Sequence, residues 1–365
     1  MTRPRIPCSS PAPREDAAAV RSAIERVVAS GWYVLGAEVA AFETEFADAT
    51  GAAHAVGVGN GTDAIALILR ALDIGPGDEV ITTPLSAAYT ALAVMMVGAR
   101  PVFVDIDPHR LTLDPAAVAD AVTSRTKALL PVHLYGQPAD MTAMKAVASR
   151  HGLALIEDCC QAHLATADGQ PVGTIGVAGA FSFYPTKNLG ALGDGGAVVT
   201  NDSALAERIR RLRHGGQTDR YRHALPGVNS RLDEMQAAIL RARLAFLREW
   251  TTARRRLAAA YRDALTGGPV DLLPERDRGH VYHLFVVRAK RRAALQQHLA
   301  AQGIETLVHY PIPIPHQQAV RAENPRECPT ATMACGEVLS LPLYPALTIA
   351  DLADVASAVC TFQEG

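Results

Sequence analysis

The segment FSFYPTKNLGALGDGG, residues 181–196, places Lys187 between an aromatic, β-prone run and a glycine-rich turn. The 35 Lys and Arg residues include few lysines: Lys127, Lys145, Lys187 and Lys290. A lysine amine can condense with an aldehyde to form a Schiff base, which a guanidinium cannot do. The sequence therefore favours a reactive amine at this position over an ordinary solvent-exposed loop lysine.

A second segment, VGVGNGTDAIALIL (56–69), predicts a strand, a tight turn and the start of a helix. The free N–H groups at a helix N-terminus bind anions, so Gly61 and Thr62 could hold a phosphate. An ordinary Asn-Gly turn before a capped helix is the alternative. The spacing fits neither the dinucleotide-binding G-x-G-x-x-G motif nor a Walker A loop. Ser182 could donate to the same phosphate or simply occupy a turn.

Asp158 follows the buried strand predicted for LALIED, at the carboxyl edge where open α/β sheets bind ligands. A carboxylate there can pair with a protonated ring nitrogen, as pyridoxal phosphate chemistry requires, or it can cap a loop. Metal binding by Asp158, Cys159, Cys160 and His163 is a further alternative. Adjacent cysteines point in diverging directions, so we predict no metal site. Acid, anion cradle and lysine together match pyridoxal 5'-phosphate.

The elements that must position these residues form an alternating pattern of strands and helices between residue 54 and about residue 200. Short apolar runs without alternation favour strands buried on both faces, and the intervening helices favour parallel crossovers. We therefore predict an α/β fold with a mostly parallel central sheet and flanking helices. A large domain with an N-terminal helical segment is expected over 1–249. A smaller C-terminal α+β domain is expected over 250–365, with a strand at 304–310.

Composition narrows the function classes. The chain has 365 residues, 49% hydrophobic residues and a net charge of −2, which gives nucleic-acid binding no electrostatic support. The one basic cluster, RARLAFLREWTTARRR (241–256), is interpreted as the solvated face of a long helix. Six cysteines without regular spacing indicate free thiols. We find no signal-peptide h-region and no long apolar stretch, so a soluble cytoplasmic protein without membrane contact is expected.

The sequence resembles the DegT/StrS-type family of pyridoxal-phosphate-dependent sugar aminotransferases over nearly its whole length. The motifs that carry the resemblance are GNGTDA (59–64), GPGDEVITTP (75–84), PVHLYGQPADM (131–141), EDCCQAH (157–163), FSFYPTKNLGALGDGGAVVTND (181–202), NSRLDEMQAAIL (229–240) and HYPIP (309–313). This resemblance implies fold type I of the aspartate aminotransferase superfamily. It also implies a homodimer in which the two chains share their active sites.

The resemblance implies a role for each matching residue. Lys187 forms the Schiff base, Asp158 pairs with the pyridine nitrogen and Gln161 lies near the ring hydroxyl. The remaining assignments are phosphate binding by Gly61, Thr62, Ser182 and the Asn229 of the partner subunit, and sugar binding by His163, His309 and Tyr310. The chain departs from the family at PLSAAYT (84–90), where many members have an ANTF-like stretch. Tyr89 is the aromatic candidate for stacking on the ring, offset from the usual place.

The activity that the resemblance implies is transfer of an amino group from L-glutamate to a keto-sugar. The acceptor is expected to be a keto-deoxysugar linked to a nucleotide (dTDP, UDP or GDP), and a keto-cyclitol is the rival acceptor. A related sugar dehydratase is a further alternative, but those enzymes have histidine at the position of Lys187. A non-catalytic cofactor-binding regulator should have lost the acid, the lysine or the phosphate cradle, and this sequence keeps all three.

Overall fold

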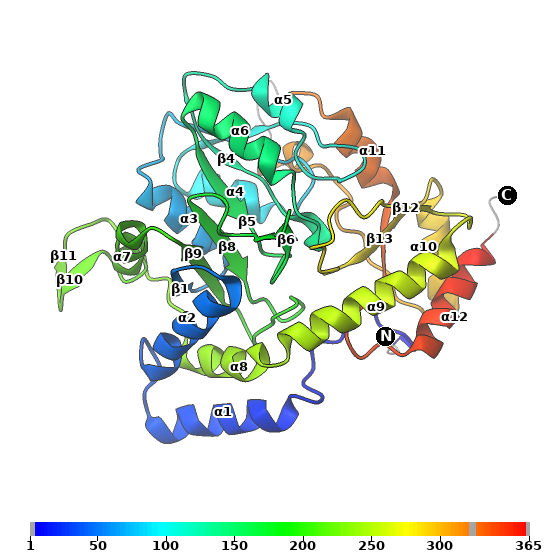
Figure 1. Ribbon diagram of the computed structural model, residues 1–365, viewed down its shortest axis with the longest axis horizontal. Helices are drawn as coiled ribbons and strands as arrows, with labels where there is room; N and C mark the ends of the chain where they lie inside the picture. Colours follow the sequence, from blue (N-terminus) through cyan, green and yellow to red (C-terminus); the bar gives the residue numbers. More distant parts are fainter. Residues whose placement is uncertain (1–3, 321–325, 363–365) are drawn as a thin grey trace.

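The computed structural model describes residues 4–320 and 326–362, and its largest element is a seven-stranded sheet (Figure 1). The strand order is β1-β9-β8-β5-β4-β2-β3. The strands are β1 (His54–Val58), β2 (Glu79–Thr82), β3 (Arg100–Phe103), β4 (Thr126–Leu130), β5 (Ala154–Asp158), β8 (Ala178–Ser182) and β9 (Gly196–Thr200). All neighbours are parallel except β9, which is antiparallel to both β1 and β8. The predicted mostly parallel sheet is therefore confirmed.

Helices cover both faces of this sheet (Figure 1). Leu129 of β4 packs into the core on one face, while its neighbours Ala128 and Leu130 pack into the core on the other. This alternation explains why each strand is apolar throughout. The first face is covered by α2 (Ala37–Thr50), α5 (Pro115–Ala119), α6 (Met141–His151) and α8 (Glu234–Leu244). The second face is covered by α3 (Gly61–Ala71), α4 (Tyr89–Met96) and α7 (Ser203–Leu212).

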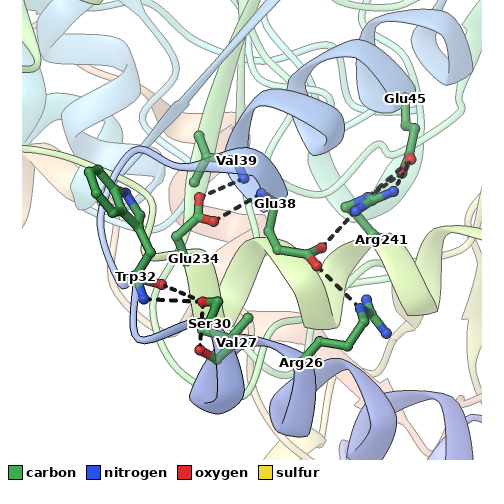
Figure 2. A network of polar contacts seen from close by, with 9 residues as sticks. All are labelled: Arg26, Val27, Ser30, Trp32, Glu38, Val39, Glu45, Glu234 and Arg241. Carbon is green, nitrogen blue, oxygen red and sulfur yellow. Dashed lines mark hydrogen bonds and ion pairs between the residues drawn. The ribbon is translucent and has the colours of Figure 1, made fainter.

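The start of α2 is fastened to α8 by a buried carboxylate (Figure 2). Glu234 accepts hydrogen bonds from the backbone N–H groups of Gly36 (2.8 Å), Glu38 (2.9 Å) and Val39 (2.8 Å). These are free N–H groups of a helix N-terminus, where a negative charge is also favoured by the helix dipole. Arg241 of α8 adds an ion pair to Glu38 at 2.7 Å. Helix α1 (Ala17–Ser30) packs against α8 as well.

The C-terminal part forms a second core around a three-stranded sheet of β12 (Asp271–Leu272), β13 (Phe285–Arg288) and β14 (Val338–Leu341). Its helices are α9 (Leu247–Leu265), α10 (Arg292–Ala301), α11 (Pro329–Glu337) and α12 (Ile349–Cys360). Ile6 packs into this C-terminal core and forms a bridge with Ile304. The N-terminal segment therefore contacts the C-terminal core before α1 begins.

Four short strands and two 3-10 helices complete the described elements. They are β6 (Thr166–Ala167), β7 (Gln170–Pro171), β10 (Gln217–Asp219), β11 (Arg222–His223), η1 (Leu134–Gly136) and η2 (Ile314–His316). The β10–β11 hairpin projects away from the body of the molecule (Figure 1). None of the helices in the described ranges combines the length and the apolar character that crossing a bilayer requires.

Two expectations are wrong. The segment 304–310 makes only single bridges, from Ile304 to Ile6 and from Leu307 to Ser340, and no strand. The basic cluster 241–256 is not one solvated helix face, because the chain leaves α8 and enters α9 within it. Arg243 and Arg254 of this cluster are buried. These two arginines do not face solvent. Their guanidinium groups make hydrogen bonds inside the molecule, to Asp16 and to backbone carbonyls.

Candidate active site

Lys187 lies in the loop between β8 and β9, at the carboxyl edge of the sheet. The loop turns tightly, with the Lys187 N–H donating to the Tyr184 carbonyl at 2.8 Å. At Gly190 an added Cβ would lie 2.4 Å from the Pro185 carbonyl oxygen, so the loop closes only with glycine there. Burial lowers the pKa of Lys187, while the nearby Cys160 and Asp158 act in the opposite direction. A lowered pKa supplies the neutral amine that attack on a carbonyl requires.

Asp158 is the last residue of β5 and only 4% of its surface is exposed. One carboxylate oxygen accepts from the Thr90 hydroxyl at 2.8 Å and the other from the Cys160 N–H at 3.1 Å. Both oxygens are thus held in place on a residue that the sheet itself positions. Thr90 belongs to α4. It was not predicted as a site residue, because its local sequence contains no motif.

The N-terminus of α3 lies directly against the end of β8. An added Cβ on Gly61 would lie 2.8 Å from both the Cys160 sulfur and the Ser182 Cβ. Asn60 caps the helix by accepting from the Asp63 N–H at 2.8 Å. Among the described residues, the N–H groups of Gly61 and Thr62 have no hydrogen-bond acceptor. The structure therefore brings Gly61, Thr62 and Ser182 together, with free donors for an anion.

Gln161 links η1 to the segment that contains His309 and Tyr310. Its carbonyl oxygen accepts from the Tyr135 N–H at 2.7 Å, and its amide donates to the Tyr310 hydroxyl at 3.1 Å. The Tyr135 hydroxyl in turn donates to the His309 carbonyl. Burial lowers the pKa of His309 to about 4, with a further contribution from Lys187, so this ring is neutral near pH 7. Tyr135 was also missed from the sequence, because its contacts come from distant segments.

Three predicted residues make none of the hydrogen bonds described above. Tyr89 begins α4 next to Thr90 and is 64% exposed. Asn229 is exposed as well, and its side chain makes no hydrogen bond within the described chain. His163 is 1% exposed and its ring lies 5.4 Å from that of Phe181. Neither ring nitrogen of His163 has a partner among the described residues, and the placement puts this side chain in the core.

The residues near Asp158 do not converge as metal ligands. Cys159 and His163 are in the core, whereas Cys160 lies against Gly61 at the sheet edge. One group of ligand-type side chains meets elsewhere in the described residues: His133, Glu157 and Cys159. The Glu157 carboxylate already accepts from His133 at 3.1 Å and from the N–H groups of the 173–176 turn. The histidine and the carboxylate of this group are thus already hydrogen-bonded to protein atoms.

A cavity of about 130 Å³ is bordered by residues of the lysine loop. Lys187 and His309 line it together with Arg243 and Arg254, and the N-terminal segment 8–16 forms one wall. Asp16 of that segment pairs with Arg243 at 2.7 Å, which fixes the wall to α8. Lys187 therefore borders this cavity and is also close enough to Cys160 and Asp158 to feel their charges.

Comparisons with known proteins define the class to which a chain with this fold and this cluster of residues belongs. The model of the DegT/DnrJ/EryC1/StrS aminotransferase family matches residues 14–360, so the chain belongs to this family and is an aminotransferase. A Streptomyces venezuelae relative described as dTDP-3-amino-3,4,6-trideoxy-alpha-D-glucose transaminase is 50% identical over 94% of this chain and 92% of its own.

Two further similarities agree. An Acidithiobacillus ferrooxidans relative, described as UDP-N-acetyl-3-dehydro-alpha-D-glucosamine 3-aminotransferase, is 46% identical over 93% of this chain and 92% of its own. The crystal structure of S. venezuelae DesV in complex with a ketimine intermediate has a TM-score of 0.94 and 49% identity, covering 98% of both chains. The predicted family and the predicted fold type I are thereby confirmed.

Proposed function

We propose that this aminotransferase uses pyridoxal 5'-phosphate to move an amino group from L-glutamate to a keto-sugar linked to a nucleotide. The observation that carries the proposal is the convergence of Lys187, Asp158 and the N-terminus of α3 at one edge of the sheet. The relatives described above, one named for a dTDP-sugar and one for a UDP-sugar, support the nucleotide-linked acceptor.

The phosphate end of the site fits this cofactor. The free N–H groups of Gly61 and Thr62, with the Ser182 hydroxyl, offer three donors to a phosphate at a helix N-terminus. Any side chain at Gly61 would collide with Cys160 and Ser182, so the cradle depends on this glycine. We propose that Asn229 of the partner subunit completes the phosphate site in a homodimer. The exposure of Asn229 in the single chain suits such a role.

The ring end fits as well. When bound, the cofactor supplies a ring that accepts electrons from the substrate carbon. Asp158, fixed by Thr90 and Cys160, would keep the ring nitrogen protonated. Gln161 would lie beside the ring hydroxyl and Tyr89 beside the ring face. Lys187 would attach the cofactor covalently and, once released as a neutral amine, move the proton to and from the reacting carbon.

The acceptor site is proposed around His309 and Tyr310, which lie next to Gln161. We include no direct sugar contact for His163, because its ring is enclosed by core aromatic residues. A keto-cyclitol remains the second acceptor class. A dehydratase is disfavoured by Lys187, and a non-catalytic regulator by the intact site. A cytoplasmic location is part of the proposal.

One experiment tests the acceptor and the reaction together. The purified holoenzyme is treated with L-glutamate, and the loss of its visible absorption and the formation of 2-oxoglutarate are measured. The resulting amine form is then mixed with a panel of nucleotide-linked keto-sugars and keto-cyclitols. We expect one nucleotide-linked keto-sugar to restore the visible absorption and to yield the amino-sugar by mass spectrometry. Restoration by keto-cyclitols alone would reject the proposed acceptor class.

A further inference from the structure

Ser340 and His309 form a hydrogen bond whose direction can be assigned from its surroundings. Ser340 lies in β14 and is fully buried. Its hydroxyl oxygen lies 2.8 Å from Nδ1 of His309 and has no other hydrogen-bond partner among the described residues. Because a buried hydroxyl proton without an acceptor costs free energy, the hydroxyl donates and Nδ1 accepts. In the neutral ring, the proton of His309 is therefore on Nε2.

The Nε2 group of His309 is available to a ligand. It makes no hydrogen bond to the described residues, and it is not fully enclosed, in contrast to both ring nitrogens of His163. His309 is partly buried and lines the cavity that Lys187 also lines. Burial, followed by the charge of Lys187, lowers the pKa of His309 to about 4, so the ring is neutral near pH 7. The free N–H is thus a neutral donor on a residue beside the lysine.

A second histidine of the cavity has the opposite arrangement. Nδ1 of His283 lies 3.1 Å from Oδ1 of Asn188, and the amide nitrogen of Asn188 donates to the Val281 carbonyl at 3.3 Å. This second bond fixes the orientation of the amide, so Oδ1 accepts and Nδ1 of His283 carries the proton. Nε2 of His283 then has only a lone pair. Of these two histidines, only His309 offers a free donor.

The position of this donor indicates what it binds. In the proposed function, Lys187 moves a proton to and from the reacting carbon, so that carbon must come close to the lysine. The charge of Lys187 also affects the pKa of His309. The Tyr310 hydroxyl is the competing donor. Burial raises the pKa of Tyr310, and the charged groups that affect it further are Asp158 and Cys160, not Lys187. His309 is therefore the better placed donor for an atom on the reacting carbon.

We propose that Ser340 holds His309 as the neutral Nε2–H tautomer, and that this N–H donates a hydrogen bond to the ketone oxygen of both carbonyl substrates. A neutral imidazole can polarise a carbonyl group in this way. His309 is then a catalytic residue and Ser340 a positioning residue. The inference rests on the proposed function, in which the two ketones are the keto-sugar and 2-oxoglutarate.

The chemical step balances without a further reactant. When the amino group attacks the ketone carbon, a C–N bond forms and the π electrons of the carbonyl move onto its oxygen. The N–H of His309 stabilises the negative charge that develops there. The two protons of the attacking amino group pass to the oxygen, which leaves as water. His309 keeps its own proton throughout.

The kinetic test uses 2-oxoglutarate, which has a ketone oxygen but no sugar. The amine form of the enzyme is mixed with saturating 2-oxoglutarate, and the return of the visible absorption is followed over a single turnover. In His309→Asn the side chain is too short to place a donor at the Nε2 position, and the rate constant should fall about 100-fold. In His309→Gln the amide nitrogen lies near that position, and the loss should be less than about tenfold. KM should change less than about threefold in both variants, because the donor acts mainly as charge develops.

The reaction with the keto-sugar separates this role from sugar binding. We expect His309→Asn to lose about 100-fold there as well, because the same ketone chemistry occurs. A residue that only binds a sugar hydroxyl would raise the KM for the keto-sugar and leave the reaction with 2-oxoglutarate unchanged. That second pattern would overturn the proposal.

The role of Ser340 is tested by a measurement that does not depend on activity. In holoenzyme labelled with ¹⁵N-histidine, NMR distinguishes protonated from unprotonated ring nitrogens, and comparison with His309→Gln identifies the signals of His309. At pH 7 we expect a protonated Nε2 and an unprotonated Nδ1. Ser340→Ala should give a mixture of the two tautomers and lower the single-turnover rate constant about tenfold, whereas Ser340→Thr keeps the hydroxyl and should restore both.

Tyr261→Phe is the matched control for Ser340→Ala. It removes another fully buried hydroxyl, which donates to the Pro342 carbonyl just after β14 at 3.0 Å. This variant should lower Tm but leave the tautomer of His309 and the single-turnover rate constant as in the wild type. Equal effects of Tyr261→Phe and Ser340→Ala on the rate constant would show a general loss of stability and overturn the role of Ser340.

The remaining outcomes separate this inference from the proposed function. A protonated Nδ1 in the wild type overturns the role of Ser340, and a wild-type rate constant in His309→Asn overturns the role of His309. Loss of the reaction with both ketones in Tyr310→Phe alone would assign the ketone oxygen to Tyr310 instead. If 2-oxoglutarate reacts but no keto-sugar does, the proposed acceptor class is wrong, and the measurements with 2-oxoglutarate still decide the role of His309. If 2-oxoglutarate does not react, the proposed donor is wrong, and the oxo acid of the amino acid that does react replaces it.

Discussion

The Thr90 hydroxyl donates a hydrogen bond of 2.8 Å to the Asp158 carboxylate, although the two residues are separated by 68 positions in the chain. Thr90 is the second residue of α4 and is buried, as is Asp158 at the end of β5. The bond fixes the direction in which the second carboxylate oxygen points. Thr90 is thus a positioning residue for the acid that we assign to the ring nitrogen.

Thr90→Val should lower kcat about tenfold, because loss of one hydrogen bond to a charged group costs about 1.5 kcal/mol. Thr90→Ser keeps the hydroxyl and should restore most of the rate. Asp158→Asn should lower kcat far more while still binding cofactor, since an amide cannot hold the ring nitrogen protonated. The role of Thr90 is tested by the pH dependence of the visible spectrum of Thr90→Val. This dependence should differ from that of the wild type, whereas a purely structural role of Thr90 would leave it unchanged.

Lys187→Arg should abolish covalent cofactor attachment and lower transamination by several orders of magnitude. Arginine keeps the charge but cannot condense stably with an aldehyde. The wild-type protein, reduced with borohydride and digested, should yield the cofactor on the peptide that contains Lys187. Lys290→Arg, at an exposed position, is the control and should keep both the absorption and the activity. A modified Lys290 peptide would contradict the assignment.

Asn229→Ala should weaken cofactor binding by about 1.5–3 kcal/mol, so that activity depends on added cofactor. If Asn229 serves the opposite subunit, a mixed dimer of Asn229→Ala and Lys187→Ala has one site with both changes and one site with neither. Activity should therefore reappear when the two inactive variants are mixed at limiting cofactor. Exchange of subunits is verified with tagged chains. Exchange without recovered activity would place Asn229 in the site of its own chain.

His163 should make the protein sensitive to acid. Burial, with a smaller effect of the Lys187 charge, lowers the pKa of His163 to about 3 from its usual 6.5. Below about pH 6.5 the His163 ring is protonated in the unfolded chain but stays neutral in the folded chain. The free energy of unfolding therefore falls as the pH falls. Between pH 8 and pH 5 this amounts to about 2 kcal/mol of the free energy of unfolding.

His163→Phe removes this titration, so its free energy of unfolding should fall by about 2 kcal/mol less over that range. Urea unfolding at pH 8 and pH 5 measures the difference. His109→Gln, at an exposed site, should follow the wild-type curve. The KM for the keto-sugar should stay unchanged in His163→Phe. A large rise in that KM would restore His163 to the sugar site and reject its role in the core.

Glu234→Gln should lower the free energy of unfolding by about 2–3 kcal/mol. The variant keeps one acceptor oxygen for the three N–H groups at the start of α2 and loses the negative charge that the helix dipole favours. Glu45→Gln removes only the partly exposed ion pair with Arg241 and should cost less than about 1 kcal/mol. Equal losses of the free energy of unfolding in the two variants would show that the buried Glu234 carboxylate contributes no more than the exposed ion pair.

Local signals explain what the sequence could reveal. Three site residues could be found from the sequence because a local pattern accompanies each one. The patterns are a glycine-rich loop at Lys187, the end of an apolar strand at Asp158 and the start of a helix at Gly61. Thr90 and Tyr135 had no such marker, because their roles depend on contacts between distant segments. Arg254 was assigned to a solvated face, because a run of arginines does not reveal which one turns inward. Which arginine is buried depends on how α9 packs between the two cores.

Helix α9 is embedded in both cores, with Leu247 in the core of the central sheet and Leu257 and Tyr261 in the C-terminal core. One inserted residue between them would turn everything beyond it by about 100° and advance it by about 1.5 Å. The C-terminal core would then meet the sheet with the wrong face, and Arg254 would leave the cavity. The number of residues in this stretch therefore sets how the two cores meet, so insertions and deletions at 248–256 should disrupt their packing. The projecting β10–β11 hairpin lies outside both cores, so a change in its length should disturb neither core (Figure 1).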